Sequence, residues 1–509
     1  MNRAQMLQTL EESSEPYDVT VIGGGATGLG VALDAANRGY RTLLLEQGDF
    51  AEATSSRSTK LIHGGVRYLR SGEVDLVRES LRERGRLLIN APEFVKPLPF
   101  VVPAYRWYER IFYGVGLMLY DLLAGKLGIE RTRHLNFEST VEKVPNLSPD
   151  GLRGATLYWD GQFDDARLAV AMASAAAKEG AIVLNHVRVD SLVHDQGHVV
   201  GLIATDAING KSFEVRSKAM INATGVFTDS VRRMDDPDAG EMMTTSQGIH
   251  LVLDEEFLGG ETAVMIPKTE DGRVLFAVPW HGKVILGTTD TGGVKVGREP
   301  VAHEEEIDYL IKHMARYLVR EPKRNDIRSV FAGLRPLVRR GEGGATSKLS
   351  RNHRIVVSKS GMVTITGGKW TTYREMAEEA IDRAIEVADL DPRDCGTQDL
   401  KLESRALEQE GEGVSLHERL PYTWAHVERA VNDEMAITLE DVLSRRLRAL
   451  LIDAEATLEV APEVCRKMAV KLNWSDAQIT AELERFRRVA VTYRPPTSQS
   501  PSSFSSEGS

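Results

Sequence analysis

Apolar runs alternate with a glycine-rich turn and a helical pattern at the start of the chain. Residues 19–22 form an apolar run, and residues 26–38 carry apolar positions at helical spacing. A second apolar run, residues 41–45, ends at Glu46. This order of strand, turn, helix and strand predicts a βαβ unit with parallel strands over residues 17–60.

Two later regions alternate in the manner of β-strands. Residues 180–225 have turn signals at D-Q-G and N-G-K and end in small residues at 223–225, where a backbone can approach a ligand closely. Four apolar runs between residues 250 and 290 indicate an antiparallel sheet on the substrate side of the molecule. Residues 362–388 then repeat the opening order of strand, Gly-Gly turn and helix.

The composition changes to polar, helix-favouring sequence from about residue 391. Residues 437–452 and 474–493 have the pattern of amphipathic helices, which predicts a small C-terminal helical domain. Residues 494–509 are rich in Ser and Pro, and we expect this tail to be disordered.

The most apolar window, residues 111–129, is interrupted by Asp121 and Lys126 and is too short to cross a bilayer comfortably. Aromatic residues and cations flank it, which suits a helix that lies at a membrane interface. A buried core helix explains the same pattern equally well, so both interpretations stay open.

Charge and cysteine content narrow the function classes. The 509 residues carry a formal net charge of -11, which argues against general nucleic-acid binding. The two cysteines are far apart, so neither a disulfide framework nor a thiolate metal site is expected. The N-terminal residues lack the apolar core of a secretory signal, and we expect a cytosolic protein without a metal site.

The glycines between the first strand and helix have the spacing G-x-G-x-x-G at Gly23, Gly25 and Gly28. In this strand–turn–helix context the pattern is the dinucleotide fingerprint, in which the helix N-terminus meets a pyrophosphate. Glu46 stands where an acidic side chain would bind ribose hydroxyls. The alternative is a glycine-rich turn in an ordinary βαβ unit.

Together the motifs resemble the FAD-dependent, quinone-reducing glycerol-3-phosphate dehydrogenases, from about residue 17 to residue 373 and more loosely to the helical end. The matching stretches are VIGGGATGLGVALDAANRG, TSSRSTKLIHGGVRYL, DDARL, NATG, GIHLVL, LGTTDT, GLRPL and GGKWTTYRE. The sequence between residues 403 and 419 is shorter than is usual in the family, so the cap is expected to be trimmed.

The resemblance implies an α/β fold with a Rossmann-like FAD-binding domain, an antiparallel-sheet substrate domain and a small C-terminal helical domain. We expect the FAD-binding domain to comprise residues 17–90, 160–240 and 350–390. The substrate domain would comprise residues 91–159 and 241–349, and the cap residues 391–493.

The resemblance also implies the reaction, which is oxidation of sn-glycerol 3-phosphate to dihydroxyacetone phosphate with transfer of a hydride to the flavin. Cations suit the substrate phosphate, and a histidine suits the hydroxyl proton. The expected catalytic residues are Arg67, His250, Arg335, Arg351 and Lys369. His250, placed at the start of a strand, is the expected base, with His63 as the alternative, and Arg354 competes with Arg351.

The residues expected to contact FAD are mostly glycines and polar residues. The hydroxyls of Thr54 and Ser55 would contact the pyrophosphate or ribitol, although helix capping explains them as well. Val187 would offer backbone contacts to the adenine. The set is Gly23, Gly25, Gly28, Glu46, Thr54, Ser55, His63, Gly64, Gly65, Val187, Gly225 and Gly368.

The expected partners are sn-glycerol 3-phosphate, a quinone acceptor and the inner face of the cytoplasmic membrane, to which the protein would bind peripherally, and the expected assembly is a homodimer. Three alternatives remain at this stage. They are a glycerol-3-phosphate oxidase that produces hydrogen peroxide, an amino-acid or sarcosine oxidase, and a flavin-carrying scaffold without activity.

Overall fold

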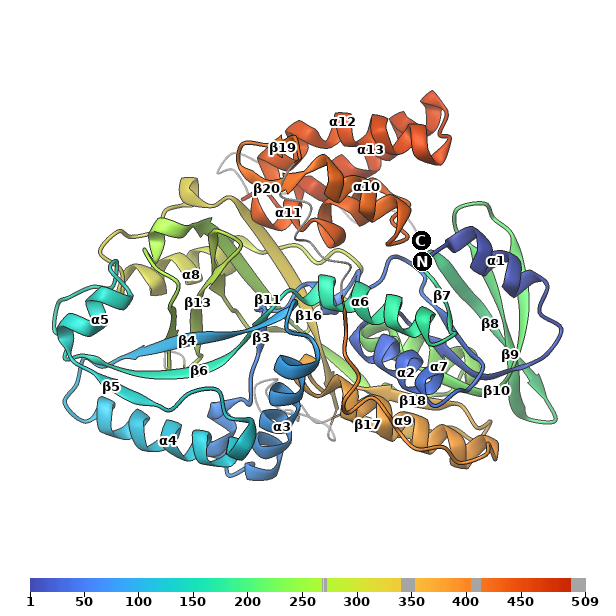
Figure 1. The fold of residues 1–509 in the computed structure, drawn as a ribbon, viewed down its shortest axis with the longest axis horizontal. Helices are drawn as coiled ribbons and strands as arrows, with labels where there is room; N and C mark the ends of the chain where they lie inside the picture. Colours follow the sequence, from blue (N-terminus) through green and yellow to red (C-terminus); the bar gives the residue numbers. More distant parts are fainter. Residues whose placement is uncertain (268, 270–271, 340–352, 404–412, 496–509) are drawn as a thin grey trace.

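The structure, a computed structural model, describes residues 1–267, 269, 272–339, 353–403 and 413–495. For Arg67, Arg70 and Ser71 it describes the backbone alone. Two β-sheets lie side by side, and the C-terminal helices sit above both in the view of Figure 1. The predicted tail from residue 496 onward and Arg351 lie outside the described residues.

The first sheet has a parallel core, as the opening pattern predicts. β1 (Tyr17–Ile22) pairs in parallel with β2 (Thr42–Leu45) and β10 (Ser212–Asn222), and β7 (Ile182–Leu184) and β18 (Val363–Thr366) extend the core. Apolar residues of these strands are buried because helices pack over them, namely α2 (Ala26–Asn37), α6 (Asp165–Lys178) and α9 (Tyr373–Ala388). The predicted βαβ unit is confirmed.

Antiparallel strands complete the first sheet. β8 (Val187–Asp195), β9 (His198–Asp206) and β10 form two hairpins at the predicted turns, and β17 (Arg354–Val357) pairs with β18. The remaining helices of this half are α1 (Arg3–Glu11) and α7 (Thr228–Asp235).

The second sheet is built mostly from antiparallel pairs and confirms the antiparallel sheet expected between residues 250 and 290. Its central strands are β11 (Met243–Asp254), β14 (Lys283–Gly287), β13 (Leu275–Trp280) and β12 (Ala263–Ile266), and β16 (Ser329–Val338) pairs with β11. The other strands are β3 (Leu61–Ile62), β4 (Val95–Pro103), β5 (Arg133–Leu135), β6 (Ala155–Phe163) and β15 (Thr291–Gly292). Helices α3 (Val74–Asn90), α4 (Glu109–Ala124), α5 (Phe137–Lys143) and α8 (Glu304–Ala315) belong to this half.

The C-terminal region is helical, as predicted, and also contains a small hairpin. It comprises β19 (Ser415–His417), β20 (Leu420–Thr423), α10 (Trp424–Asn432), the π-helix η10 (Asp441–Arg446), α11 (Ala449–Ile452), α12 (Ala454–Leu472) and α13 (Asp476–Val491). Its apolar core also includes Trp280 and Phe331 of the second sheet, so the cap is packed against that sheet.

One predicted element is wrong. The single amphipathic helix expected over residues 437–452 is divided at Arg448, whose φ is +64°. A regular amphipathic helix would leave Arg445, Arg446 and Arg448 on a face exposed to water. All three side chains are buried instead, so the segment does not have the solvated cationic face that the pattern predicts.

Helix α4 keeps a large apolar face in contact with solvent. Gly114, Leu117, Tyr120 and Ala124 face inward. The opposite face is exposed and carries Ile111, Phe112, Val115, Met118, Leu119 and Leu122, next to exposed Trp107. The interpretation of residues 111–129 as a buried core helix is therefore wrong for this face. Among the described residues, none of the helices combines the length and the apolar character needed to cross a membrane.

Candidate functional site

The glycine-rich turn joins β1 to α2, and steric reasons require glycine at positions 23 and 28. Gly23 has a φ of +109°, which side-chain-bearing residues rarely adopt. A Cβ on Gly28 would lie 1.8 Å from the carbonyl oxygen of Gly23. Gly25 is the N-cap of α2, and the Ala26 N–H donates to Ser55 Oγ at 2.9 Å. The turn therefore brings the positive end of a helix to the edge of the sheet.

Glu46 follows β2 and is fixed by the same turn. Its carboxylate accepts hydrogen bonds from the Gly24 N–H at 2.6 Å and from the Gly48 N–H at 2.8 Å. Burial raises the pKa of Glu46 above its usual value, and the two amide donors oppose that shift. The carboxylate is thus held rigidly at the end of a strand.

A cavity opens at the carboxyl ends of the parallel strands. Ile22 of β1, Leu45 of β2 and Thr366 of β18 line it, as does Ala223, which follows β10. Ligands of parallel α/β sheets bind at this edge. The cavity is also lined by the predicted residues Gly23, Gly25, Glu46, Thr54, Ser55, Val187, Gly225, Gly368 and Lys369.

Gly225, Gly367 and Gly368 line the cavity and have left-handed backbones that the sequence position alone does not reveal. Gly225 has a φ of +57° and Gly368 a φ of +80°. A Cβ on Gly368 would lie 2.3 Å from Met376 Sδ. The wall of the cavity at these points is therefore backbone, which fits the flat surface of a nucleotide or flavin.

Gly64 and Gly65 lie outside the lining and have a packing role. The Gly64 N–H donates to Tyr120 Oη at 2.6 Å, and a Cβ there would lie 2.7 Å from the Leu81 side chain. Gly65 has a φ of +76°. These glycines let the basic loop, which is the cation-rich stretch of residues 55–73, lie against α3 and α4. Gly28 likewise acts by packing rather than by lining the cavity.

His63 also lies outside the lining but is tied to it through its backbone. Its N–H donates to Thr371 Oγ1 at 3.2 Å, and its carbonyl accepts from the same hydroxyl at 3.3 Å. Thr371 lies two residues after Lys369, so the basic loop and the Gly-Gly turn are adjacent. Arg67 follows in the short helix η2 (Val66–Ser71).

Lys369 is the predicted cation that lines the cavity. Its Nζ lies 3.2 Å from Ser80 Oγ and 4.4 Å from the centre of the Tyr68 ring. An ammonium group in this position can attract an anionic ligand, and the aromatic face stabilises the charge.

Arg335 reaches the same region from the second sheet. Within the β11–β16 pair it lies opposite Ser246. Its guanidinium donates to Thr288 Oγ1 at 3.0 Å and to the Thr289 carbonyl at 2.9 Å. The neighbouring Pro336 lines the cavity, so β16 forms part of its wall.

His250 lies in the middle of β11, which corrects its predicted position at the start of a strand. It is 3% exposed, stacks on Phe331 with ring centres 4.7 Å apart, and its Nε2 lies 2.9 Å from Thr59 Oγ1. Nδ1 has no hydrogen-bond partner among the described residues. Burial, and then the charges of Lys60 and Arg335, hold its pKa well below the usual value, so the ring is neutral at pH 7.

Several lining residues were missed in the sequence. Thr224 and Trp370 fall inside recognised motifs, which could have identified them, but Arg298 lies in a loop without a motif. Lys60 is fully buried and donates to Asp165 at 2.7 Å. Burial lowers its pKa to about 7 despite that carboxylate.

Comparison with known proteins gives a consistent set of relatives. Residues 18–374 match the family described as FAD dependent oxidoreductase, and residues 362–479 match the C-terminal domain of alpha-glycerophosphate oxidase. A probable mitochondrial glycerol-3-phosphate dehydrogenase of Caenorhabditis elegans is 39% identical, over 95% of this chain and 74% of that protein. The mitochondrial glycerol-3-phosphate dehydrogenase of Homo sapiens is 38% identical, over 96% and 75%.

A solved structure covers nearly all of both chains. It is the glycerol-3-phosphate dehydrogenase of Bacillus halodurans complexed with FAD, with a TM-score of 0.79 and 28% sequence identity. The alignment spans 98% of this chain and 99% of that one.

Proposed function

Because the chain belongs to the FAD-dependent oxidoreductases, and within them to the glycerol-3-phosphate dehydrogenase family, we propose that it passes electrons from its substrate to a quinone at a membrane surface. It is an FAD-dependent enzyme that oxidises sn-glycerol 3-phosphate to dihydroxyacetone phosphate. The observation that carries this conclusion is that relatives named for the activity align with at least 95% of the chain.

The residues of the cavity fit FAD. The turn at Gly23–Gly25 and the N-terminus of α2 suit the pyrophosphate, and Glu46 retains lone pairs for ribose hydroxyls while its two amide bonds hold it in place. We assign the adenine to the backbone of Val187. When bound, FAD supplies the hydride acceptor.

We assign the substrate phosphate to Lys369 and Arg335. Lys369 lines the cavity, and Arg335 is next to a lining residue. The guanidinium is already oriented by Thr288 and Thr289, so binding an anion costs it little conformational freedom. Arg67 and Arg351 remain candidates from the sequence.

We assign the hydroxyl proton to His250. The ring is neutral at pH 7, which is the form that accepts a proton, and its hydrogen bond to Thr59 fixes its orientation. His63 is the alternative, and the variants His250→Gln and His63→Gln distinguish the two. The base is the residue whose replacement lowers kcat by at least about 100-fold while the protein keeps its flavin.

We propose that α4 docks the enzyme on the membrane. Its exposed side chains Ile111, Val115, Met118 and Leu122 are spaced by three or four residues and so form one stripe. Exposed Arg110 and Lys126 at the two ends of the helix suit anionic lipid headgroups. A stripe of this size in contact with water is otherwise unfavourable. We place it on the inner face of the cytoplasmic membrane, where a quinone is accessible.

Oxygen is the second candidate acceptor, because residues 362–479 match a domain named after an oxidase. Purified enzyme with substrate is assayed in air and, separately, under nitrogen with a soluble quinone analogue. The quinone proposal expects quinone-dependent turnover under nitrogen and little peroxide in air. Fast peroxide release that added quinone does not change would assign the acceptor to oxygen. The predicted homodimer stays a prediction, which light scattering in solution can test.

A further inference from the structure

Three arginines of the C-terminal region are buried where it meets the cavity wall. Arg445 and Arg446 belong to the π-helix η10, and Arg448 stands at the break before α11. Their exposed fractions are 3%, 2% and 0%. Charged side chains are buried this deeply only when they are paired, so their partners identify the part of the FAD-binding half that the cap contacts.

Asp49 is the partner of the first two. It is fully buried and lies three residues after Glu46. Its carboxylate accepts from Arg445 Nε at 2.6 Å and from both terminal nitrogens of Arg446, at 2.6 and 2.9 Å. The Asn185 side-chain amide donates to the same group at 3.0 Å. Two cap arginines therefore converge on one carboxylate of the FAD-binding half.

Arg448 holds a second point of the same segment. Its Nη2 donates to the Ser56 carbonyl at 2.8 Å and to Asp165 at 2.9 Å. Asp165 also accepts from the Ser58 N–H at 3.1 Å and from Lys60 Nζ at 2.7 Å. The backbone after Ser56 is thus fixed from the cap and from α6 together.

The two contact points bracket part of the FAD cavity. Residues 51–55 line the cavity without interruption, and Asp49 and Ser56 stand on either side of them. The Ala51 N–H donates to the Gly24 carbonyl at 2.9 Å, and Ser55 Oγ accepts from Ala26. Movement of this segment would therefore disturb the turn that receives the pyrophosphate.

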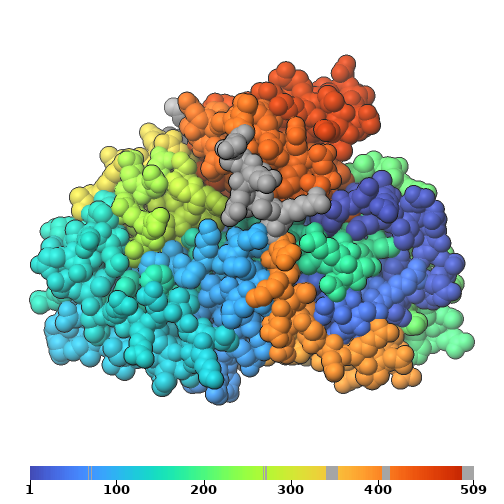
Figure 2. Space-filling view, in the orientation of Figure 1, coloured from blue at the N-terminus to red at the C-terminus, as the bar shows by residue number. Residues whose placement is uncertain are grey.

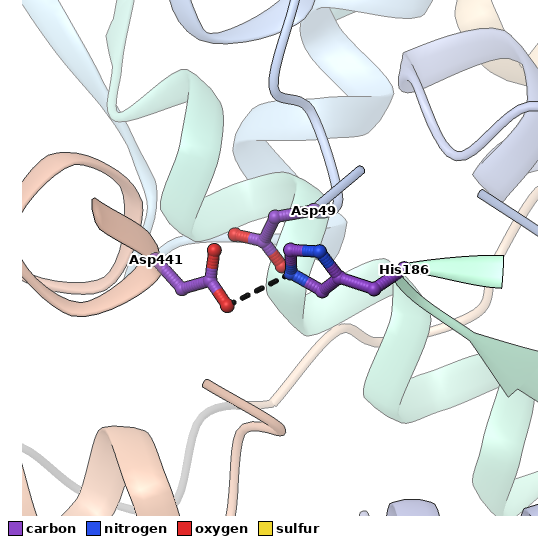
Figure 3. A group of neighbouring side chains, drawn as sticks. All are labelled: Asp49, His186 and Asp441. Atoms are coloured by element: carbon purple, nitrogen blue, oxygen red, sulfur yellow. Dashed lines mark hydrogen bonds and ion pairs between the residues drawn. The ribbon is translucent and has the colours of Figure 1, made fainter. Parts of the chain in front are cut away.

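A buried histidine joins the same arrangement. Figure 3 shows His186, Asp49 and Asp441 converging from three separate segments of the chain, two loops and η10, with a hydrogen bond of 3.0 Å between His186 Nε2 and Asp441. The His186 N–H donates to the Gly48 carbonyl at 2.6 Å. Ligand atoms of the three side chains lie within 4.8 Å of one another, but arginine nitrogens already balance both carboxylates. The group is an ion-pair junction rather than a cation site.

From these two contact points we propose that Arg446 and Arg448 are positioning residues for FAD. They clamp residues 49–56 against the cofactor, Arg446 through Asp49 and Arg448 through the Ser56 carbonyl. The inference rests on the proposed FAD site. It makes retention of the cofactor depend on contacts with the cap. Neither residue lines the cavity, so the effect is transmitted through the loop.

The test uses the holoenzyme and the variants Arg446→Lys and Arg448→Lys, which keep the charge but lose the planar fork. The matched control is Arg38→Lys. Arg38 is 7% exposed and pairs with buried Asp34 at 2.8 Å, but it lies at the far end of α2 and outside the cavity lining. The rate of FAD release is followed by the fluorescence of free flavin after dilution, and the thermal unfolding temperature is measured in parallel.

The clamp predicts that FAD release becomes at least about tenfold faster in both cap variants and changes by less than about twofold in Arg38→Lys. Unchanged release in the cap variants, or equal acceleration in all three, would overturn it. A preparation of the wild-type protein without flavin would instead count against the FAD assignment itself. That result is seen before any variant is made.

If a cap variant does not fold, hydrogen exchange of the wild-type protein with and without FAD tests the same proposal. Because coupling between two sites is reciprocal, removal of FAD should increase exchange in residues 49–56 and in residues 441–448 together. An increase confined to residues 49–56 would contradict the clamp.

Discussion

Arg335 offers the most direct test of how the enzyme holds its substrate phosphate. The perturbation is Arg335→Ala. The side chain is 22% exposed, so solvent screens its charge less than that of a surface arginine. Charge-assisted hydrogen bonds of this kind contribute more than neutral ones. We expect the variant to lose on the order of 2 to 4 kcal/mol in kcat/KM, which is a factor of about 30 to 900.

The fold should tolerate this change. Strand β16 is held to β11 by backbone pairing over ten positions, so truncating one side chain leaves the strand in place. The partners left behind are the Thr288 hydroxyl, the Thr289 carbonyl, the Ser246 hydroxyl and the Asp290 carboxylate. The Asp290 side chain is 23% exposed, so water can reach the position that the guanidinium vacates. The loss should therefore appear in kinetics and not in flavin content.

The assay measures kcat/KM for sn-glycerol 3-phosphate with a soluble quinone analogue. The matched control is Arg339→Ala, because Arg339 follows the same strand but is 49% exposed and pairs with the exposed Glu241. We expect the control to stay within about twofold of wild type. If Arg335→Ala keeps wild-type kcat/KM and full flavin content, Arg335 does not bind the phosphate.

Three further predictions concern separate parts of the account. Lys369→Met should raise KM by at least about tenfold in protein that keeps its flavin, and an unchanged KM would remove Lys369 from the phosphate site. The pKa of His250 is well below 6.5 in the folded state, so the unfolded state binds more protons below that pH and the free energy of unfolding should fall on acidification. His250→Gln should weaken this fall, as measured by urea unfolding at pH 7 and pH 5. An identical pH dependence in the variant and the wild type would refute the prediction. The double variant Val115→Asp, Leu122→Asp should lose binding to anionic vesicles without loss of activity in solution. The control Val470→Asp, at a 79% exposed position on α12, should bind these vesicles as the wild type does. Retained binding of the double variant would exclude α4 as the docking surface.

The fold could be predicted where local pattern and burial agree. The first βαβ unit follows from apolar runs on both sides of a turn in which Gly23 and Gly28 are sterically required, and the structure confirms it. The hairpins between residues 187 and 222 follow from alternation and turn residues. The predicted position of Glu46 beside the cavity rests on the same local logic.

Elements whose character depends on distant partners could not be predicted in the same way. The sequence S-R-R-L-R at residues 444–448 is typical of a solvated helix face. Its arginines are nevertheless buried, because they form ion pairs with Asp49 and Asp165, which lie hundreds of residues earlier in the chain. The environment of His250 depends on Thr59, Lys60 and Arg335, which the fold assembles from separate segments.

Helix α4 shows a different limit. A periodicity argument identifies a helix there, but an apolar face against the core and an apolar face against water give the same pattern of letters. Contacts with the rest of the fold decide which residues are covered. The exposed stripe became visible only in the three-dimensional arrangement.

The central claim is that a flavin in the cavity takes a hydride from sn-glycerol 3-phosphate. The most direct measurement mixes the purified yellow protein with that substrate in the absence of oxygen and follows the visible flavin absorption. The account predicts rapid bleaching, which does not occur with glycerol at the same concentration. Flavin bands that persist with glycerol 3-phosphate but bleach with glycine or sarcosine would contradict it.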